Sequence, residues 1–202
     1  MQSAAEAAAV LCKDASFTLL AFPVSSWNDD FSPWPAPPVF GKDGFAGHAS
    51  ETLLWLTEHC LPELPDVPKL IGGYSLAGLF SLWALYTCRA FQGACSCSGS
   101  LWYPGWSDFA RNHPAPQDAI VYLSLGDREE KTRNRAMAAV GSATRSQYAL
   151  LQSDPAIRES ALVWHPGGHF EQPERRMAEG IAWLAHHTCR RTAASNPPQN
   201  HD

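Results

Sequence analysis

The sequence predicts an α/β fold in which helices cover both faces of a mostly parallel sheet. Short apolar runs alternate with segments of helical pattern, as they do where helices join parallel strands. The runs are apolar nearly throughout rather than at every second residue, which is typical of strands buried on both faces. The length of 202 residues suits one domain, so we expect residues 1–202 to form a single domain without a cap domain.

Apolar runs and turn residues predict where the elements lie along the chain. Five strands are expected, at residues 17–24, 69–74, 93–98, 119–125 and 161–165. Helices are expected at residues 3–11, 76–89, 130–152 and 172–189. One more helix is expected to begin after Ser50, which would cap its N-terminus, and to end at the prolines from Pro62 onward. Residues 25–47 are predicted to form a long, ordered loop rich in Trp and Pro, and residues from about 192 a polar, frayed tail.

Charge and composition exclude several classes of partner. The net charge is −5 and no basic patch is visible, which argues against nucleic acid. No apolar stretch approaches the ~20 residues that a membrane-spanning helix needs, and the first residues do not resemble a signal peptide. The six cysteines include no C-x-x-C pair, and Cys95 and Cys97 are expected to be small buried residues on one face of a strand. We therefore expect a cytoplasmic protein with reduced thiols that needs no metal or cofactor.

A candidate nucleophile follows the second predicted strand. Gly73, Tyr74, Ser75, Leu76 and Ala77 form a small-x-Ser-x-small pattern between an apolar strand and an apolar helix. A serine at the apex of such a turn needs small residues two positions before and after it, because the two backbone segments approach closely there. The helix N-terminus favours negative charge at the same place, so the N–H of Leu76 is expected to stabilise an oxyanion. The pattern predicts Ser75 as the nucleophile.

Chain order selects a general base for this serine. In sites of this kind the acid and then the histidine follow the serine along the chain. Only His165 and His169 come after the last predicted strand has begun and before the last helix. His165 closes the strand, whereas His169 lies in the following glycine-rich loop, which could bring an imidazole over the carboxyl ends of the strands. We expect His169 to be the base.

The candidate acid follows the strand at residues 119–125, where three carboxylates compete. The acid must reach the histidine and hold its tautomer by a hydrogen bond. A Gly-x-x-acid spacing favours Glu129, with Asp127 as the alternative, while Glu130 is suited to capping the next helix. A Ser–His pair without an essential carboxylate also remains open.

Substrate contacts are expected from two aromatic segments. The second oxyanion donor should come from the backbone just after the first strand, at Ser25, Ser26 or, our preferred choice, Trp27. Trp34 in the long loop and Trp102 after the third strand could form an aromatic wall for an acyl or aryl group. A purely structural aromatic cluster is the equal alternative.

Four segments together resemble a known family: GGYSLAGLFSLWA, SGSLWYPGW, SLGDREEKTRN and HPGGHFEQP. They are similar to an α/β-hydrolase-fold esterase family related to enterochelin-type (siderophore) esterases and to esterase D. The resemblance extends from about residue 17 to 184 and implies ester hydrolysis through an acyl-enzyme, with Ser75 and His169 as the catalytic pair. Ala77 stands where the commonest version has glycine, and the N-terminal strands of the full fold are expected to be missing.

The sequence thus predicts a serine hydrolase that cleaves a small ester through an acyl-enzyme on Ser75. Its activity should fall at acidic pH, when the His169 imidazole becomes protonated. Three alternatives remain: an acyltransferase or peptidase that uses the same residues, a non-catalytic binding protein of the same fold, and a subunit that docks a partner through its Trp- and Pro-rich loop.

Overall fold

Four parallel strands form the sheet of this protein. We describe residues 4–12, 17–39 and 41–194 of a computed structural model. The strands are β1 (Leu70–Tyr74), β2 (Gly93–Cys97), β3 (Ala119–Gly126) and β4 (Ile157–His165), and they lie in that order across the sheet. Tyr74 lies beside Cys97, and Cys97 beside Ser124, so the carboxyl ends of the strands meet at one edge. The loops that follow the strands therefore gather at that edge.

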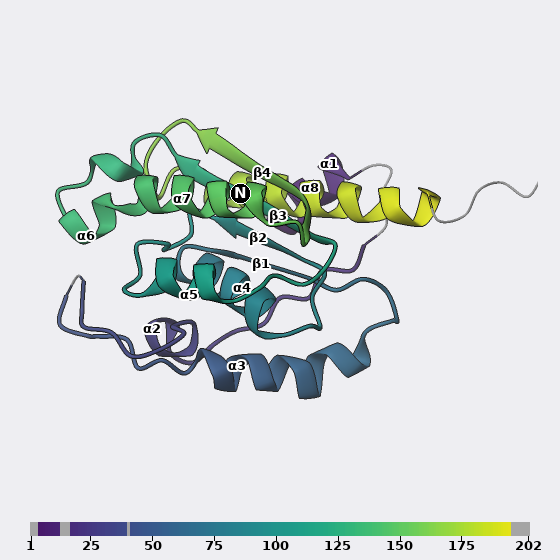
Figure 1. Cartoon of the computed structure of the whole chain (residues 1–202), viewed down its shortest axis with the longest axis horizontal. Coiled ribbons are helices and arrows are strands. Elements are labelled where there is room, and N and C mark those ends of the chain that lie inside the picture. Colours follow the sequence, from purple (N-terminus) through teal and green to yellow (C-terminus); the bar gives the residue numbers. More distant parts are fainter. Residues whose placement is uncertain (1–3, 13–16, 40, 195–202) are drawn as a thin grey trace, which may run out of the picture.

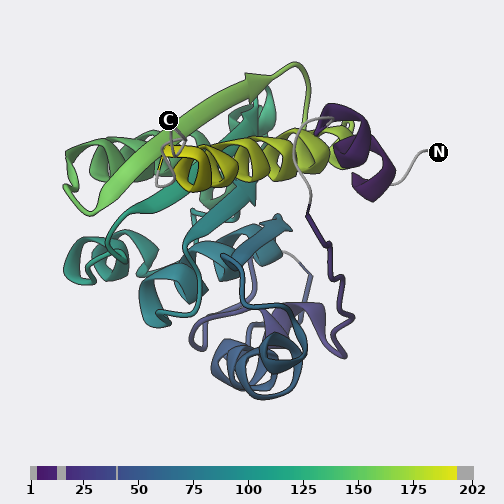
Figure 2. The same cartoon turned by 90° about the vertical axis from the view of Figure 1, so that its right-hand side faces the viewer.

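Helices cover both faces of the sheet (Figures 1 and 2). One face carries α8 (Pro173–Ala194) with α1 (Ala4–Leu11) beside it, and the other carries α4 (Leu76–Thr87), α5 (Trp106–Asn112) and α7 (Val140–Ser153). The remaining helices are short: α2 (Trp27–Asp30), α3 (Ala49–Trp55) and α6 (Arg135–Ala138). This arrangement confirms the predicted α/β class, and the sheet is entirely parallel.

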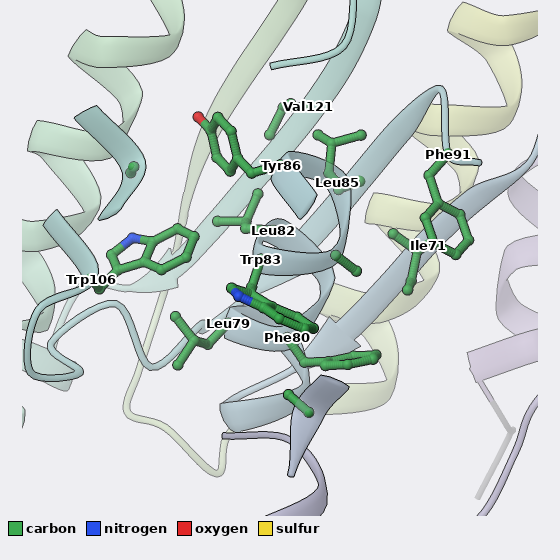
Figure 3. Close-up of a cluster of buried hydrophobic side chains, with 14 of the residues drawn as sticks. Ile71, Leu79, Phe80, Leu82, Trp83, Leu85, Tyr86, Phe91, Trp106 and Val121 are labelled. Carbon is green, nitrogen blue, oxygen red and sulfur yellow. The ribbon is translucent and has the colours of Figure 1, made fainter. Parts of the chain in front are cut away.

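The main core lies between the sheet and α4. Ten of the twelve residues of α4 are buried, because this helix is covered by the sheet on one side and by α5 and the long N-terminal loop on the other. Figure 3 shows Leu79, Leu82 and Leu85 packed with Val121 of β3 and Trp106 of α5. On the opposite face, a smaller cluster joins the strands to α8. Cys95 and Cys97 are fully buried there, as expected from their spacing.

The first predicted strand is absent. Residues 17–24 run beside the sheet without joining any strand, so the sheet has four strands rather than the expected five. Phe22 and Val24 pack against the core, but Leu19 and Leu20 keep 45% and 47% of their surface exposed. An apolar run becomes a strand only if a neighbour completes its hydrogen-bond ladder, and β1, at this edge of the sheet, pairs only with β2.

Helix boundaries also differ from the expectations. His48, not Ser50, precedes the helix α3, which continues as a π-helical turn at Leu56–Cys60 and a 3-10 turn at Leu61–Glu63. The helix expected at residues 130–152 is divided, because Asn134 accepts hydrogen bonds from two backbone N–H groups and starts α6 as a separate turn.

The last strand and helix are longer than expected. β4 begins at Ile157 rather than at residue 161. The helix α8 continues to Ala194, beyond the expected start of the polar tail, and residues 195–202 lie outside the described part. No helix in the described ranges is long and apolar enough to cross a membrane.

Candidate active site

Ser75 stands at a sharp turn between β1 and α4. Its backbone has φ 58° and ψ −121°, a left-handed conformation that non-glycine residues rarely adopt. A Cβ atom on Gly73 would lie 2.3 Å from the carbonyl oxygen of Ala77, so a side chain cannot fit where the strand and helix meet. The turn is held by backbone hydrogen bonds, in which the Ser75 N–H donates to Cys97 and the Ser75 carbonyl accepts from Ser100. The strained backbone is thus fixed by its surroundings.

His169 approaches this serine from the loop between β4 and α8. Its Nε2 lies 3.1 Å from the Ser75 Oγ, within hydrogen-bond distance. The Tyr74 hydroxyl donates a 2.6 Å hydrogen bond to the backbone carbonyl of His169, which ties the loop to the end of β1. The two residues are 94 positions apart in sequence, and the parallel sheet brings them together because both follow carboxyl ends of strands.

Glu129 completes a chain of hydrogen bonds behind His169. Its Oε2 lies 2.8 Å from His169 Nδ1, and the residue is only 7% exposed. The other oxygen, Oε1, accepts three hydrogen bonds, from the Ser98 hydroxyl, the Gly126 N–H and the Arg176 guanidinium, at 2.7, 2.8 and 2.8 Å. A carboxylate with these donors holds the proton of His169 on Nδ1, which leaves Nε2 free to accept from Ser75.

The other two carboxylates of this segment have different partners. Asp127 is exposed and accepts a 2.8 Å hydrogen bond from the Gly167 N–H, so it shapes the loop that carries His169 without touching the imidazole. Glu130 forms an ion pair with Arg145 of α7 instead of capping a helix. Among the three acids weighed from the sequence, the structure places Glu129 beside the histidine.

The surroundings of Glu129 favour its ionised form. Burial alone would raise the pKa of this carboxyl, but hydrogen bonds from His169, Ser98 and the Gly126 N–H outweigh burial and lower the pKa below its ordinary value of 4.5. The group is therefore a carboxylate at neutral pH.

This lowered pKa predicts how stability depends on pH. A carboxyl whose pKa is lower in the folded state stabilises the fold above its unfolded-state pKa, and the contribution is lost as the pH falls through the folded-state value. We expect the free energy of unfolding of the wild type to exceed that of Glu129→Gln at pH 7, and the difference to shrink below about pH 4.5. Urea unfolding at several pH values measures this; a difference that is equal at pH 7 and at about pH 3 would contradict it.

The three residues line a cavity of about 500 Å³ at the carboxyl edge of the sheet. Its walls are mostly apolar and include Trp27, Trp102 and Met137. A neighbouring hollow of about 700 Å³ shares Trp27 and Phe45 with this cavity but contains none of the three catalytic candidates. We regard the smaller cavity as the site because it is the one that reaches the Ser75 hydroxyl.

The expected aromatic wall is only partly present. Trp102 lines the cavity, but Trp34 is not among its lining residues. The indole N–H of Trp34 donates a 2.8 Å hydrogen bond to the Pro104 carbonyl, and its ring packs against Tyr103 and Phe109. Trp34 therefore fixes the long loop to the body of the domain.

Both expected oxyanion donors lie at this cavity. Leu76 is the first residue of α4, where helix N–H groups have no acceptor within the helix. Trp27 is the first residue of α2 and lines the same cavity. The first residues of two helices thus contribute to the lining of the cavity that contains Ser75.

Several polar residues of the site did not emerge from the sequence. Ser98 and Arg176 bond to Glu129, and the Ser100 hydroxyl lies 3.5 Å from that of Ser75. Ser98 and Ser100 follow the carboxyl end of β2, a position that could have drawn attention to them. Arg176 had no such signal, because it is one of two adjacent arginines in a polar stretch of helix.

Basic side chains also line the cavity, although the sequence shows no basic cluster. Arg128 and Lys131 come from the loop and short turn after β3. Arg128 pairs with Glu171 at 2.9 Å, and the positive charge of Lys131 helps to lower the pKa of the neighbouring Glu130 carboxyl. The lining of the cavity therefore combines two exposed basic side chains with mostly apolar walls.

The parallel sheet with helices on both faces has the architecture of the α/β-hydrolase fold, and comparisons with solved structures agree. The siderophore hydrolase EstA from Aspergillus nidulans superimposes with a TM-score of 0.65 at 20% identity, over 83% of this chain and 70% of that one. The enterobactin esterase Fes from Shigella flexneri gives a TM-score of 0.55 at 21% identity, over 67% of this chain and 38% of that one. An IroE-like serine hydrolase from Shewanella oneidensis gives 0.60 at 15% identity, over 79% and 56%.

At these identities the likeness establishes the fold. The chain spans less than two thirds of the length of Fes and of the IroE-like hydrolase. No protein-family model matches the sequence, and no curated protein is significantly similar to it.

Proposed function

We propose that this protein is a serine hydrolase that cleaves carboxylic esters through an acyl-enzyme on Ser75. The observation that carries the proposal is the continuous hydrogen-bonded chain from Ser75 Oγ through His169 to the buried Glu129 carboxylate. The serine stands at a strained turn and lines a mostly apolar cavity together with His169 and Glu129. The likeness of the fold to serine hydrolases and siderophore esterases supports the same reaction class.

Acylation follows from this geometry. His169 Nε2 accepts the proton of the Ser75 hydroxyl while the oxygen forms a bond to the ester carbonyl carbon. The carbonyl oxygen becomes an oxyanion, which the N–H groups of Leu76 and Trp27 would stabilise by about 3 kcal/mol each. His169 then returns the proton to the leaving alcohol as the bond between carbon and the alcohol oxygen breaks. Glu129 stabilises the imidazolium that exists between these two proton transfers.

Deacylation repeats the same steps with water. His169 removes a proton from a water molecule, whose oxygen attacks the acyl carbon, and then protonates Ser75 as the ester bond to the enzyme breaks. The products are a carboxylic acid and the free serine. The residues present suffice for this chemistry, so the mechanism uses no step that needs a metal or a cofactor.

The cavity favours a small ester with an apolar or aromatic part. Its interior presents Trp102, Phe45 and Val140, while Arg128 and Lys131 add positive charge near the opening. A volume of about 500 Å³ suits a small molecule rather than a folded protein. Siderophore hydrolases among the structural neighbours are a further reason to include siderophore esters in a substrate screen.

Labelling with a fluorophosphonate tests the proposal, because this probe reacts far faster with an activated serine than with an ordinary hydroxyl. We expect one covalent adduct on the wild type by intact-mass analysis, located on Ser75 by peptide mapping, and none on Ser75→Ala. Ser142→Ala, a change of an exposed serine on α7, is the matched control and should label like the wild type. A folded wild-type protein that takes up no adduct would favour the binding-protein alternative.

Product analysis then separates hydrolysis from acyl transfer. With an ester substrate in water alone, a hydrolase releases the acid, whereas an acyltransferase gives a new ester or amide once an alcohol or amine is added. The positions of Ser75, His169 and Glu129 are compatible with both, so the acceptor decides between them.

A further inference from the structure

Two adjacent arginines at the start of α8 have opposite surroundings. The side chain of Arg175 is 69% exposed and pairs with Glu179 one turn later on the same helix. Arg176 is only 1% exposed and lies directly behind the Glu129–His169 pair. Burial of a guanidinium is costly unless an opposite charge and hydrogen bonds compensate it. The contacts of Arg176 therefore indicate what the buried guanidinium does.

One nitrogen of this guanidinium holds the acid. Arg176 Nη1 donates to Glu129 Oε1 at 2.8 Å and to the Ser98 hydroxyl at 2.9 Å. Ser98 in turn donates to the same carboxylate oxygen at 2.7 Å. The carboxylate is thus fixed through Oε1, while Oε2 remains directed at His169.

The other nitrogen holds the loop that carries the base. Arg176 Nη2 donates to the Gly168 carbonyl at 2.9 Å and lies 3.4 Å from the Pro166 carbonyl. Nη1 also reaches the Tyr74 hydroxyl at 3.2 Å, and this hydroxyl donates to the carbonyl of His169. The guanidinium therefore holds two consecutive carbonyl groups of the loop: that of Gly168 directly, and that of His169 through the Tyr74 hydroxyl.

We infer that Arg176 is a positioning residue that sets the distance and angle between Glu129 and His169. The inference rests on the proposed function, since it concerns the same three groups. Arg176 has no hydrogen bond to Ser75 among the described residues and does not line the cavity. Its planar guanidinium donates hydrogen bonds in two directions: Nη1 binds the Glu129 carboxylate, and Nη2 binds the loop that carries His169. Lysine cannot replace it, because an ammonium is a point charge without this fork.

Paired substitutions of the two arginines test the inference. In Arg176→Lys we expect kcat to fall about 10²-fold with KM changed less than about threefold, because a small misplacement of a catalytic group lowers the rate without removing substrate contacts. Arg175→Met, the neighbouring change on the exposed face, should leave both constants within about twofold of the wild type. Thermal unfolding of each variant verifies that it is folded.

A double-mutant cycle with Glu129→Gln distinguishes positioning from general support of the fold. If Arg176 acts through the acid, Arg176→Lys should lower kcat much less in the Glu129→Gln background than in the wild type. Equal losses in the two backgrounds, or a folded Arg176→Lys variant with wild-type kcat, would overturn the inference. Should Arg176→Lys fail to fold, Tyr74→Phe removes the hydroxyl that connects Arg176 Nη1 to the His169 carbonyl and leaves the guanidinium in place; kcat should still fall several-fold at constant KM.

The proposed function and the positioning role of Arg176 can be overturned separately. A wild-type protein without Ser75-dependent turnover of any ester would overturn the proposed function. Ser75-dependent turnover that is indifferent to Arg176→Lys and to Tyr74→Phe would leave the proposed function in place and remove only the positioning role of Arg176.

Discussion

Replacing His169 with alanine should lower kcat/KM for an ester substrate by about 10⁴- to 10⁶-fold. The imidazole is the group within hydrogen-bond distance of the Ser75 hydroxyl that can accept its proton, at 3.1 Å from Nε2. Without it the serine must lose its proton to water, and the leaving alcohol must depart unprotonated. The side chain is 23% exposed, so its removal leaves no large cavity in the core and the fold should persist.

Two further variants make this result specific. His113→Ala changes an exposed histidine that bonds to the Phe109 carbonyl at the end of α5, and should keep wild-type kinetics. Ser75→Ala combined with His169→Ala should be hardly less active than either single variant, because the two groups act as a unit. A His169→Ala enzyme that keeps more than about a tenth of the wild-type kcat/KM would exclude His169 as the general base.

The parts of this molecule that depend on local pattern could be predicted from the sequence. The predicted starts of β1, β2 and β3 agree with the structure to within one residue, whereas β4 begins four residues before its predicted start because its first residues, IRES, are mostly polar. The turn at Ser75 was recognisable because its small neighbours are a steric necessity, as the contact between a Gly73 Cβ and Ala77 shows. Chain order and strand ends then placed His169 and Glu129 at the same edge.

What depends on partners distant in the sequence could not be predicted. Residues 17–24 have the composition of a buried strand, but a strand exists only where a neighbour offers a free backbone edge in register. Trp34 and Trp102 looked alike in the sequence, and only the fold shows that one ring packs under a loop while the other lines the cavity. Arg176 is distinguished from Arg175 by the face of α8 that the sheet covers.

The turn at Ser75 leads to the prediction with the largest expected effect on stability. Gly73→Ala should destabilise the protein by about 3 kcal/mol. The new Cβ would lie 2.3 Å from the Ala77 carbonyl oxygen and 2.4 Å from the adjoining carbon, and both are backbone atoms that cannot move aside as a flexible side chain could. Urea unfolding measures the change in the free energy of unfolding.

The same substitution should also slow the reaction of Ser75. To relieve the contact, β1 and α4 must separate, and this shifts the Ser75 hydroxyl away from His169 Nε2. A displacement of about 1 Å can lower a rate by about 10²-fold, so fluorophosphonate labelling should slow by at least this factor.

Gly41→Ala is the control: its Cβ meets no atom within 4 Å, and only its φ of 69° opposes a side chain. It should cost about 1 kcal/mol and leave labelling unchanged. If Ser75 of the Gly73→Ala variant reacted with the fluorophosphonate at the wild-type rate, the position of Ser75 would not depend on the close contact between β1 and α4.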